Sequence, residues 1–297
     1  MNIFASTTKP LFGLFTTEGT NLPNGFYFFG MEVRFYAIFI LVGALTALFL
    51  ASYRAHKKGY PWETYDVVFI TAFPAGIIGA RIWYVIAEWN TKFGPNFSSD
   101  PFAMFRTWDG GLAIQGGVIG GILIGVLMVM WRRKGMSVFK AADFAVPTIL
   151  IAQAIGRWGN FMNGEVYGQF VTTDAWNFLP SFIINNLHTE GGLIGAPLFF
   201  VEGLINIGGY FFLTHGIDML FGKFYEDGDA VCCYFVWYGV VRAVLEPLRN
   251  PKYIMGGGES MKSVSMAIAF VVVGLIALVA NHVIRYQLRK KKQETIK

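Results

Sequence analysis

Three long segments without a charged residue constrain this chain most. No Asp, Glu, Lys or Arg occurs between Arg34 and Arg54, between Asp109 and Arg132, or between Lys262 and Arg285. A helix that crosses a bilayer needs about 20 mostly apolar residues, which each of these segments provides. Only 14% of the 297 residues are charged, against about 25% in soluble domains. We therefore predict an all-α membrane protein that crosses the bilayer several times.

Four further apolar segments each contain one or two charged residues, which brings the predicted number of spans to seven. They are residues 67–87 with Arg81, 144–163 with Arg157, 195–214 with Glu202, and 230–248 with Arg242 and Glu246. If the N-terminus is outside, 14 of the 24 Lys and Arg residues fall in the inner segments. Basic residues concentrate in cytoplasmic loops. We therefore expect an outside N-terminus and a cytoplasmic C-terminus.

The rest of the chain divides into three predicted regions. Residues 1–30 are predicted to form an interfacial arm, because they contain several Phe and Tyr residues that anchor at membrane surfaces. Residues 31–285 are predicted to form the seven-helix domain, with a small extracytoplasmic head at about residues 164–194. Residues 286–297 form a basic tail, which we interpret as a topology anchor rather than a nucleic-acid-binding arm. We expect no nucleic-acid partner.

Glycines recur along the third predicted span. Gly110–Gly111, Gly116–Gly117, Gly120–Gly121 and Gly125 follow one another mostly at spacings of three and four. Small residues at this spacing let helix backbones approach closely in lipid. We expect most of these glycines to serve helix packing.

Three arginines, Arg81, Arg157 and Arg242, lie inside predicted spans. Each would cost about 2.5–3.5 kcal/mol at the centre of a membrane helix, so each needs a partner, a water-filled cavity or an anionic ligand. The alternative to a functional role is a structural ion pair, such as Arg242 with Glu246 or Arg81 with Glu88. Such pairs leave unexplained the polar residues that cluster beside Arg157, which are Asn160, Asn163 and Glu165.

Helical spacing indicates where the polar residues point. Two predicted spans each have a polar stripe on one face, since residues three or four apart are neighbours on a helix. One stripe consists of Tyr234, Tyr238, Arg242, Glu246 and Arg249, and the other of Gln153, Arg157 and Asn160. Facing each other, these stripes would line one hydrophilic cavity. A guanidinium binds phosphate through two parallel hydrogen bonds, so a phospholipid head group is the natural ligand.

Several common catalytic patterns do not occur in the sequence. It has no H-E-x-x-H zinc motif, no G-x-S-x-G elbow and no Walker loop. Its two cysteines, Cys232 and Cys233, lack the spacing of a zinc site or a disulfide framework, and we interpret them as packing residues.

Residues 156–165 read Gly-Arg-Trp-Gly-Asn-Phe-Met-Asn-Gly-Glu. This segment resembles the G-R-x-G-N-F-x-N-x-E signature of the prolipoprotein diacylglyceryl transferase family, which specifies seven positions. The similarity extends from about residue 31 to residue 285. It includes Arg34-Phe35-Tyr36-Ala37, Trp108-Asp109-Gly110-Gly111-Leu112, Gly116-Gly117, and Tyr238-Gly239-Val240-Val241-Arg242 with Glu246 and Arg249.

The resemblance implies a seven-helix inner-membrane enzyme that needs no metal or cofactor. Such an enzyme transfers the diacylglyceryl group of phosphatidylglycerol to the lipobox cysteine in the signal peptide of a preprolipoprotein and releases glycerol phosphate. Its expected partners are these two substrates and membrane lipids. By resemblance, Arg157 and Arg242 are the catalytic pair. The expected substrate-binding residues are Tyr36, Gln115, Asn160, Asn163, Glu165, Tyr238, Glu246 and Arg249.

Two positions depart from the family pattern. Gln115 stands where well-known members have a histidine that has been interpreted as the base for the thiol. Because glutamine accepts no proton at neutral pH, Gln115 is expected to contribute hydrogen bonds only. Glu165, Tyr36 and water remain candidates for the base. Ala196-Pro197 also replaces a His-Pro pair of the family.

Two other functions stay open from the sequence alone. The intramembrane arginines would also suit a transporter or flippase for anionic lipids or solutes. Such transporters often have repeated halves, and this sequence shows no internal repeat. A catalytically inactive lipid-binding homologue is a further alternative, against which the intact signature argues.

Overall fold

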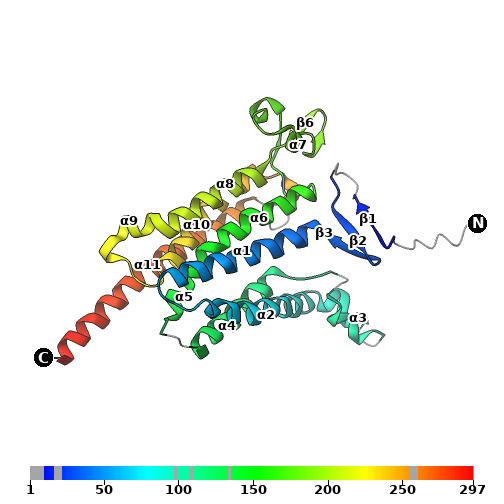
Figure 1. Ribbon diagram of the computed structural model, residues 1–297. Helices are drawn as coiled ribbons and strands as arrows, with labels where there is room; N and C mark the ends of the chain where they lie inside the picture. The colour runs from blue at the N-terminus through cyan, green and yellow to red at the C-terminus, as the bar shows by residue number, and fades with distance from the viewer. Residues whose placement is uncertain are drawn as a thin grey trace, which may run out of the picture. The chain divides into compact units, whose positions relative to one another are not determined.

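The computed structural model describes residues 10–16, 22–96, 99–107, 110–132, 135–254 and 260–296. Most of these residues are helical. They form two compact units, of which the first comprises the described residues up to Ala47 and from Ala145 onward, and the second comprises Leu48–Phe144 (Figure 1).

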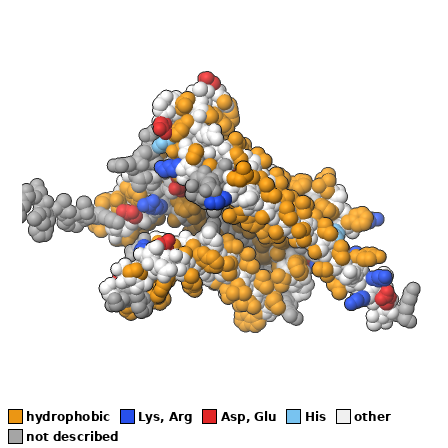
Figure 2. Space-filling view, turned by 180° about the vertical axis from the view of Figure 1, so that it is seen from behind, with side chains coloured by type: hydrophobic (Ala, Val, Ile, Leu, Met, Phe, Trp, Pro, Cys, Tyr) orange, Lys and Arg blue, Asp and Glu red, His pale blue; other side chains and the backbone are white. Residues whose placement is uncertain are grey.

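Within the described part of the chain, six helical segments are long and apolar enough to cross a membrane. They are Phe35–Lys57, Glu63–Ala87, Val138–Met162, Leu198–Phe224, Asp229–Leu248 and Met261–Thr295. A further apolar helix, Gln115–Trp131, is shorter. The six long segments fall on six of the predicted spans, and the count of seven spans stays a prediction. Many of their large hydrophobic side chains are exposed, and they cover much of the face shown in Figure 2.

Five long helices dominate the first unit. They are α1 (Phe35–Lys57, whose first half belongs to this unit), α6 (Ile149–Met162), α8 (Leu198–Phe211), α10 (Asp229–Leu245) and α11 (Ser260–Ile296). Helix α6 packs mainly against α8, and α10 mainly against α11. A 3-10 turn at Val146–Thr148, which contains Pro147, precedes α6. A π-helical turn (Phe212–Gly216), α9 (Ile217–Phe221) and a 3-10 turn (Gly222–Phe224) extend α8.

Two strands in the predicted interfacial arm and a third directly after it form a small antiparallel sheet, which the all-α expectation missed. Its strands are β1 (Phe12–Phe15), β2 (Gly25–Phe28) and β3 (Met31–Arg34), in that order. Aromatic residues favour strands. Phe29 and Gly30 join β2 to β3 with positive φ angles of 48° and 77°, as a type I′ hairpin turn requires. Residues 1–9 and 17–21 of the arm lie outside the described residues.

The predicted head, residues 164–194, forms a small structured subdomain. It contains β4 (Phe170–Val171), a 3-10 turn (Thr173–Trp176), α7 (Ser181–Ile184), β5 (Thr189–Glu190) and most of β6 (Leu193–Gly195). The strands form one sheet in the order β4-β6-β5. Its buried core includes Leu179, Ile183, Leu187 and Ile194, which pack with Phe161 of α6 and Phe199 of α8. The head is therefore fixed to the C-terminal end of α6 and the N-terminal end of α8 by hydrophobic contacts.

The second unit is built on α2 (Glu63–Ala87) and α4 (Ile114–Arg132), which pack closely. A side chain at Gly116 would collide with the backbone of Gly79, which confirms the predicted packing role for this glycine. The unit also contains a π-helical turn (Trp89–Phe93), α3 (Gly94–Asn96), a 3-10 turn (Pro101–Phe105) and α5 (Val138–Ala145, which ends at the boundary of the unit).

The alternative of an ion pair between Arg81 and Glu88 is wrong. Arg81 is buried and donates to four backbone carbonyls, those of Ala103, Met104, Gly110 and Gly111, at 2.6–2.8 Å. The loop after α2 folds back onto the helix and supplies these carbonyls, so Arg81 serves structure. Trp108 and Asp109, which belong to the resemblance in this loop, lie outside the described residues.

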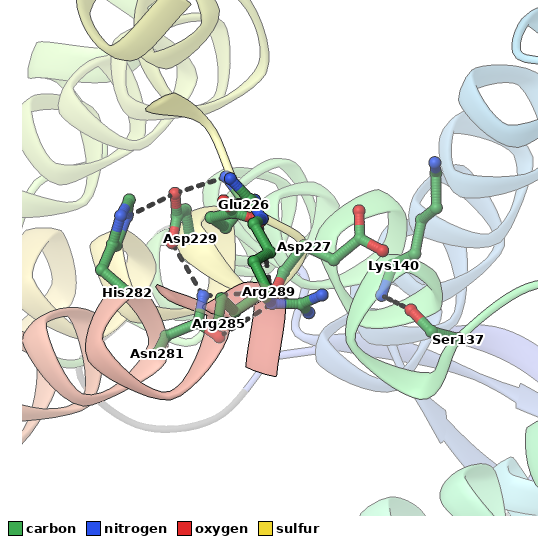
Figure 3. A network of polar contacts seen from close by, with 9 residues as sticks. All are labelled: Ser137, Lys140, Glu226, Asp227, Asp229, Asn281, His282, Arg285 and Arg289. Atoms are coloured by element: carbon green, nitrogen blue, oxygen red, sulfur yellow. Dashed lines mark hydrogen bonds and ion pairs between the residues drawn. The ribbon is translucent and has the colours of Figure 1, made fainter. Parts of the chain in front are cut away.

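Where α10 begins, a polar network joins it to α11 (Figure 3). Asp229 is fully buried and accepts hydrogen bonds from the Glu226 backbone (2.8 Å) and Asn281 (2.9 Å). Nε2 of His282 lies 3.0 Å from Oδ2 of Asp229, the oxygen that also accepts from the Glu226 backbone. Arg289 of α11 pairs with Glu226. This network fixes the first turn of α10 against α11.

Candidate functional site

Arg157, in the middle of the signature, lies on α6 and has two polar partners. It donates from Nη2 to Oε1 of Glu202 at 2.5 Å and from Nη1 to Oδ1 of Asn160 at 3.3 Å. Asn160 is one turn further along the same helix face, as the spacing predicted. The predicted polar stripe on α6 is therefore confirmed, and its arginine is paired with a carboxylate of another helix.

Glu202 is a site residue that the sequence analysis did not include. It lies on the apolar helix α8, its side chain is 6% exposed, and it bridges two arginines. Its second oxygen accepts from Nη2 of Arg249 at 3.1 Å. The sequence did indicate a role for Glu202, because it is a carboxylate inside an apolar span. An unpaired charge at such a position costs free energy, so a partner is expected. Spacing alone could not name its partners, because they come from other segments.

Arg249 continues the contacts to the end of α10. Its Nε lies 3.5 Å from Oε2 of Glu246, and Nη2 of Arg242 lies 3.0 Å from the same oxygen. Glu246 is fully buried, and Arg242 and Arg249 are 8% and 5% exposed. The predicted ion pair between Arg242 and Glu246 is thus confirmed, as part of a larger arrangement.

These contacts form one continuous cluster, which we call the arginine–carboxylate chain: Arg157, Glu202, Arg249, Glu246 and Arg242. Counted over the described residues, it contains three positive and two negative side chains, a surplus of one positive charge. Burial, and next the neighbouring Arg242, lowers the pKa of the Arg249 guanidinium from its usual value. Guanidinium groups nevertheless stay charged in proteins. The arginine–carboxylate chain is therefore suited to bind an anion.

The rest of the signature surrounds Glu165. Oε1 of Glu165 accepts from the amides of Asn160 (3.1 Å) and Asn163 (3.2 Å). Gly164 and Val166, on either side, have positive φ angles of 62° and 58°. For a β-branched residue such as Val166 this conformation is strained, and such strain concentrates at functional sites. The turn after α6 thus directs the Glu165 carboxylate back toward Asn160 and Asn163.

Tyr36, in the first turn of α1, packs against the signature. A Cβ atom at Gly159 would meet the ring and Cα of Tyr36, so this glycine is needed for the close approach of α1 and α6. The Tyr36 hydroxyl is within electrostatic reach of Glu165 and Arg157. The structure therefore brings Tyr36 to the predicted site.

The two predicted polar stripes meet deeper in the bundle. Gln153 of α6 donates to the hydroxyl of Tyr234 on α10 at 3.2 Å. Tyr238, one turn further along α10, stacks on Tyr234 with ring centroids 6.1 Å apart. The facing of the stripes is confirmed, and the hydrophilic cavity between them stays a prediction.

Gln115 lies in the first turn of α4, in the second unit. Its membership of the site stays a prediction. Among the described residues, no three His, Cys, Asp or Glu side chains come together as a metal ion would require.

Comparison with known proteins relates most of this chain to one family. A family model described as "Prolipoprotein diacylglyceryl transferase" matches residues 23–280. Several relatives are named phosphatidylglycerol--prolipoprotein diacylglyceryl transferase. The protein from Shouchella clausii is 36% identical over 250 residues, which cover 84% of this chain and 85% of that protein. The Bacillus cereus protein is 36% identical over 84% of this chain and 88% of its own length. The Staphylococcus saprophyticus protein is 31% identical over 88% and 90%.

Proposed function

Because the chain belongs to the prolipoprotein diacylglyceryl transferase family, we propose that its arginine–carboxylate chain binds the phosphate of phosphatidylglycerol for transfer of the diacylglyceryl group. The protein is a transferase that carries out the first step of lipoprotein maturation. The acceptor is the lipobox cysteine in the signal peptide of a preprolipoprotein.

The surplus positive charge of the chain is the observation that supports this role of the site. The phosphodiester of phosphatidylglycerol has a single negative charge, which would neutralise that surplus. Arg157 is the best-placed arginine to receive it, because its side chain, at 19% exposed, is the most exposed of the five in the arginine–carboxylate chain. A guanidinium has five N–H donors, and Arg157 uses one each on Nη1 and Nη2 for Asn160 and Glu202, so donors remain for a phosphate.

The reaction places clear demands on these residues. The cysteine sulfur attacks the glyceryl carbon that is bound to the phosphate oxygen, forming a C–S bond. The C–O bond breaks, and its electron pair stays on the phosphate of the departing glycerol phosphate. Arg157 and Arg242 stabilise the charge that develops there, because preorganised donors act strongly away from water. The thiol proton passes to a base, for which Glu165, Tyr36 and water are the candidates.

The other expected site residues support this arrangement. Glu246 and Arg249 orient the two catalytic arginines through the ion pairs described above. Asn160 and Asn163 orient Glu165, while Tyr36, Tyr238 and Gln115 are proposed to contact substrate. No metal or cofactor takes part in this proposal.

The topology is part of the same proposal. The six long helices and the shorter helix Gln115–Trp131 cross the bacterial cytoplasmic membrane as seven spans. The N-terminus and the head face outward, where signal peptides emerge, and the basic tail at residues 286–297 faces the cytoplasm. Basic residues at the inner ends of the spans support this orientation.

The test combines the purified protein in detergent with phosphatidylglycerol and a fluorescent lipobox peptide that has one cysteine. We expect the peptide to gain the mass of a diacylglyceryl group, and a Cys→Ala peptide to gain none. Arg157→Lys and Arg242→Lys keep the charge but lose the planar fork, and should abolish transfer. Arg289→Lys, at an exposed pair with Glu226, is the matched control and should stay active.

Two results would contradict the proposal. Wild-type-like transfer by both Arg→Lys variants would show that the arginine–carboxylate chain is not the phosphate site. Movement of phosphatidylglycerol across vesicles without any peptide product would indicate a lipid transporter instead.

A further inference from the structure

Two buried N–H donors in the first unit have no hydrogen-bond acceptor among the described residues. One is Nδ2 of Asn206, whose residue is 3% exposed, and the other is the indole Nε1 of Trp237. Buried donors are nearly always paired, because an unpaired one loses its water without compensation. These two donors therefore indicate that a hydrogen-bond acceptor binds next to them.

The two donors belong to one helix seam. Asn206 lies on α8, three residues before Gly209 and hence on the same helix face. The indole of Trp237, on α10, lies directly over Gly209, where a side chain would collide with Nε1. Phe212, in the π-helical turn that follows α8, stacks on the same indole with ring centroids 5.6 Å apart. Asn206 and Trp237 thus face the same region between α8 and α10.

This region lies one to one and a half helical turns deeper than the arginine–carboxylate chain. Asn206 follows Glu202 by four residues on α8, which is about 6 Å along the axis. Trp237 precedes Arg242 by five residues on the oppositely directed α10, or about 7.5 Å. Both donors are therefore displaced from the charges in the same direction, toward the middle of the span.

A phospholipid has an acceptor at this depth. When its phosphate is bound, its next polar groups toward the membrane interior are the acyl ester carbonyls, which accept hydrogen bonds and donate none. We propose that Asn206 and Trp237 donate to an ester carbonyl of the bound lipid, so that this site selects diacyl glycerolipids. The proposal rests on the function proposed above, since it takes the phosphate position as its reference.

The packing of the helices offers the lipid a route to these donors. Because α8 packs mainly against α6, and α10 mainly against α11, the seam between α8 and α10 has few contacts of its own. Separation of this seam would admit a glycerolipid from the side.

The experiment compares diacyl phosphatidylglycerol with its dialkyl ether analogue, which lacks ester carbonyls. Both lipids are measured as competitors for a fluorescent phosphatidylglycerol, so that an affinity is obtained whether or not the ether lipid reacts. The variants are Asn206→Leu and Trp237→Phe, which keep the shape and remove the N–H donor. Trp131→Phe, at a tryptophan that is 77% exposed on α4, is the matched control.

We expect each donor variant to bind the diacyl lipid about tenfold more weakly, the size of one hydrogen bond. The ether lipid should bind wild type and variants equally. The unfolding temperature of lipid-free Asn206→Leu should not fall, because the donor has no partner in the protein. The control should bind both lipids as wild type does.

Two results would overturn the inference. An equal loss of affinity for both lipids in both variants would show that these residues act on packing alone. Unchanged affinity for the diacyl lipid would show that neither residue contacts it. Failure of the wild-type protein to form the lipidated peptide would instead refute the proposed function, and that assay is independent of the ether lipid.

Discussion

The substitution Glu202→Gln tests the arginine–carboxylate chain at its centre. Glutamine keeps the shape of the side chain but removes the charge that Arg157 and Arg249 share at 2.5 and 3.1 Å. Loss of one member of a buried ion pair costs about 3–5 kcal/mol. Arg249 keeps Glu246, and Arg157 is 19% exposed, so we expect the lower end, about 3 kcal/mol.

The same substitution should strengthen the binding of anions. The net charge of the arginine–carboxylate chain would rise from one positive charge to two. This favours binding of the dianionic glycerol phosphate over the monoanionic substrate. We therefore expect lower stability without ligand, a larger stabilisation by added glycerol phosphate, and stronger product inhibition of transfer.

Thermal unfolding in detergent, with and without glycerol phosphate, measures the first two effects, and the peptide transfer assay measures the third. Glu190→Gln, at an exposed carboxylate in β5, is the matched control and should behave as wild type. If Glu202→Gln unfolds at the wild-type temperature and binds glycerol phosphate no more tightly, then Glu202 does not balance the two arginines, and the charge argument is refuted.

Three further predictions concern residues outside the arginine–carboxylate chain. Gly159→Val should destabilise the protein by about 1–3 kcal/mol and impair transfer, because the new side chain collides with Tyr36; thermal unfolding and the peptide assay measure this. Asp229→Ala should lower the unfolding free energy by about 3 kcal/mol or more, because it removes a fully buried acceptor of several hydrogen bonds; denaturant titration measures this. Burial, followed by a hydrogen bond with Tyr253, raises the pKa of Tyr167 from 10.0 to about 12. Between these values the folded state retains a proton that the unfolded state loses, so stability should fall as the pH rises from 10 to 12. Tyr167→Phe should remove part of that fall in pH-dependent unfolding, whereas Tyr286→Phe, at an exposed tyrosine, should not.

What could be predicted from the sequence is what one helix determines by itself. Helical spacing placed Arg157 beside Asn160, and Arg242 beside Glu246, because both pairs lie within four residues. The bridge through Glu202 could not be predicted, since it depends on how α8 packs against α6 and α10. Arg81 shows the same limit, because its four carbonyl partners come from an irregular loop whose path no periodicity indicates.

The head contributes to the site through its backbone. Gly168 forms an antiparallel bridge with Arg249, and the amide of Gln169 donates to the carbonyl of Leu248 at 2.9 Å. On the other side of Arg249, the amide of Asn250 donates to the carbonyl of Tyr167 at 3.1 Å. Arg249 lies beyond the last helical turn of this segment, where the chain would otherwise be free to move. Because the head fixes the backbone on both sides of Arg249, its guanidinium remains between Glu202 and Glu246. We therefore expect substitutions that loosen the residue 167–169 segment to weaken phosphate binding without contacting the lipid.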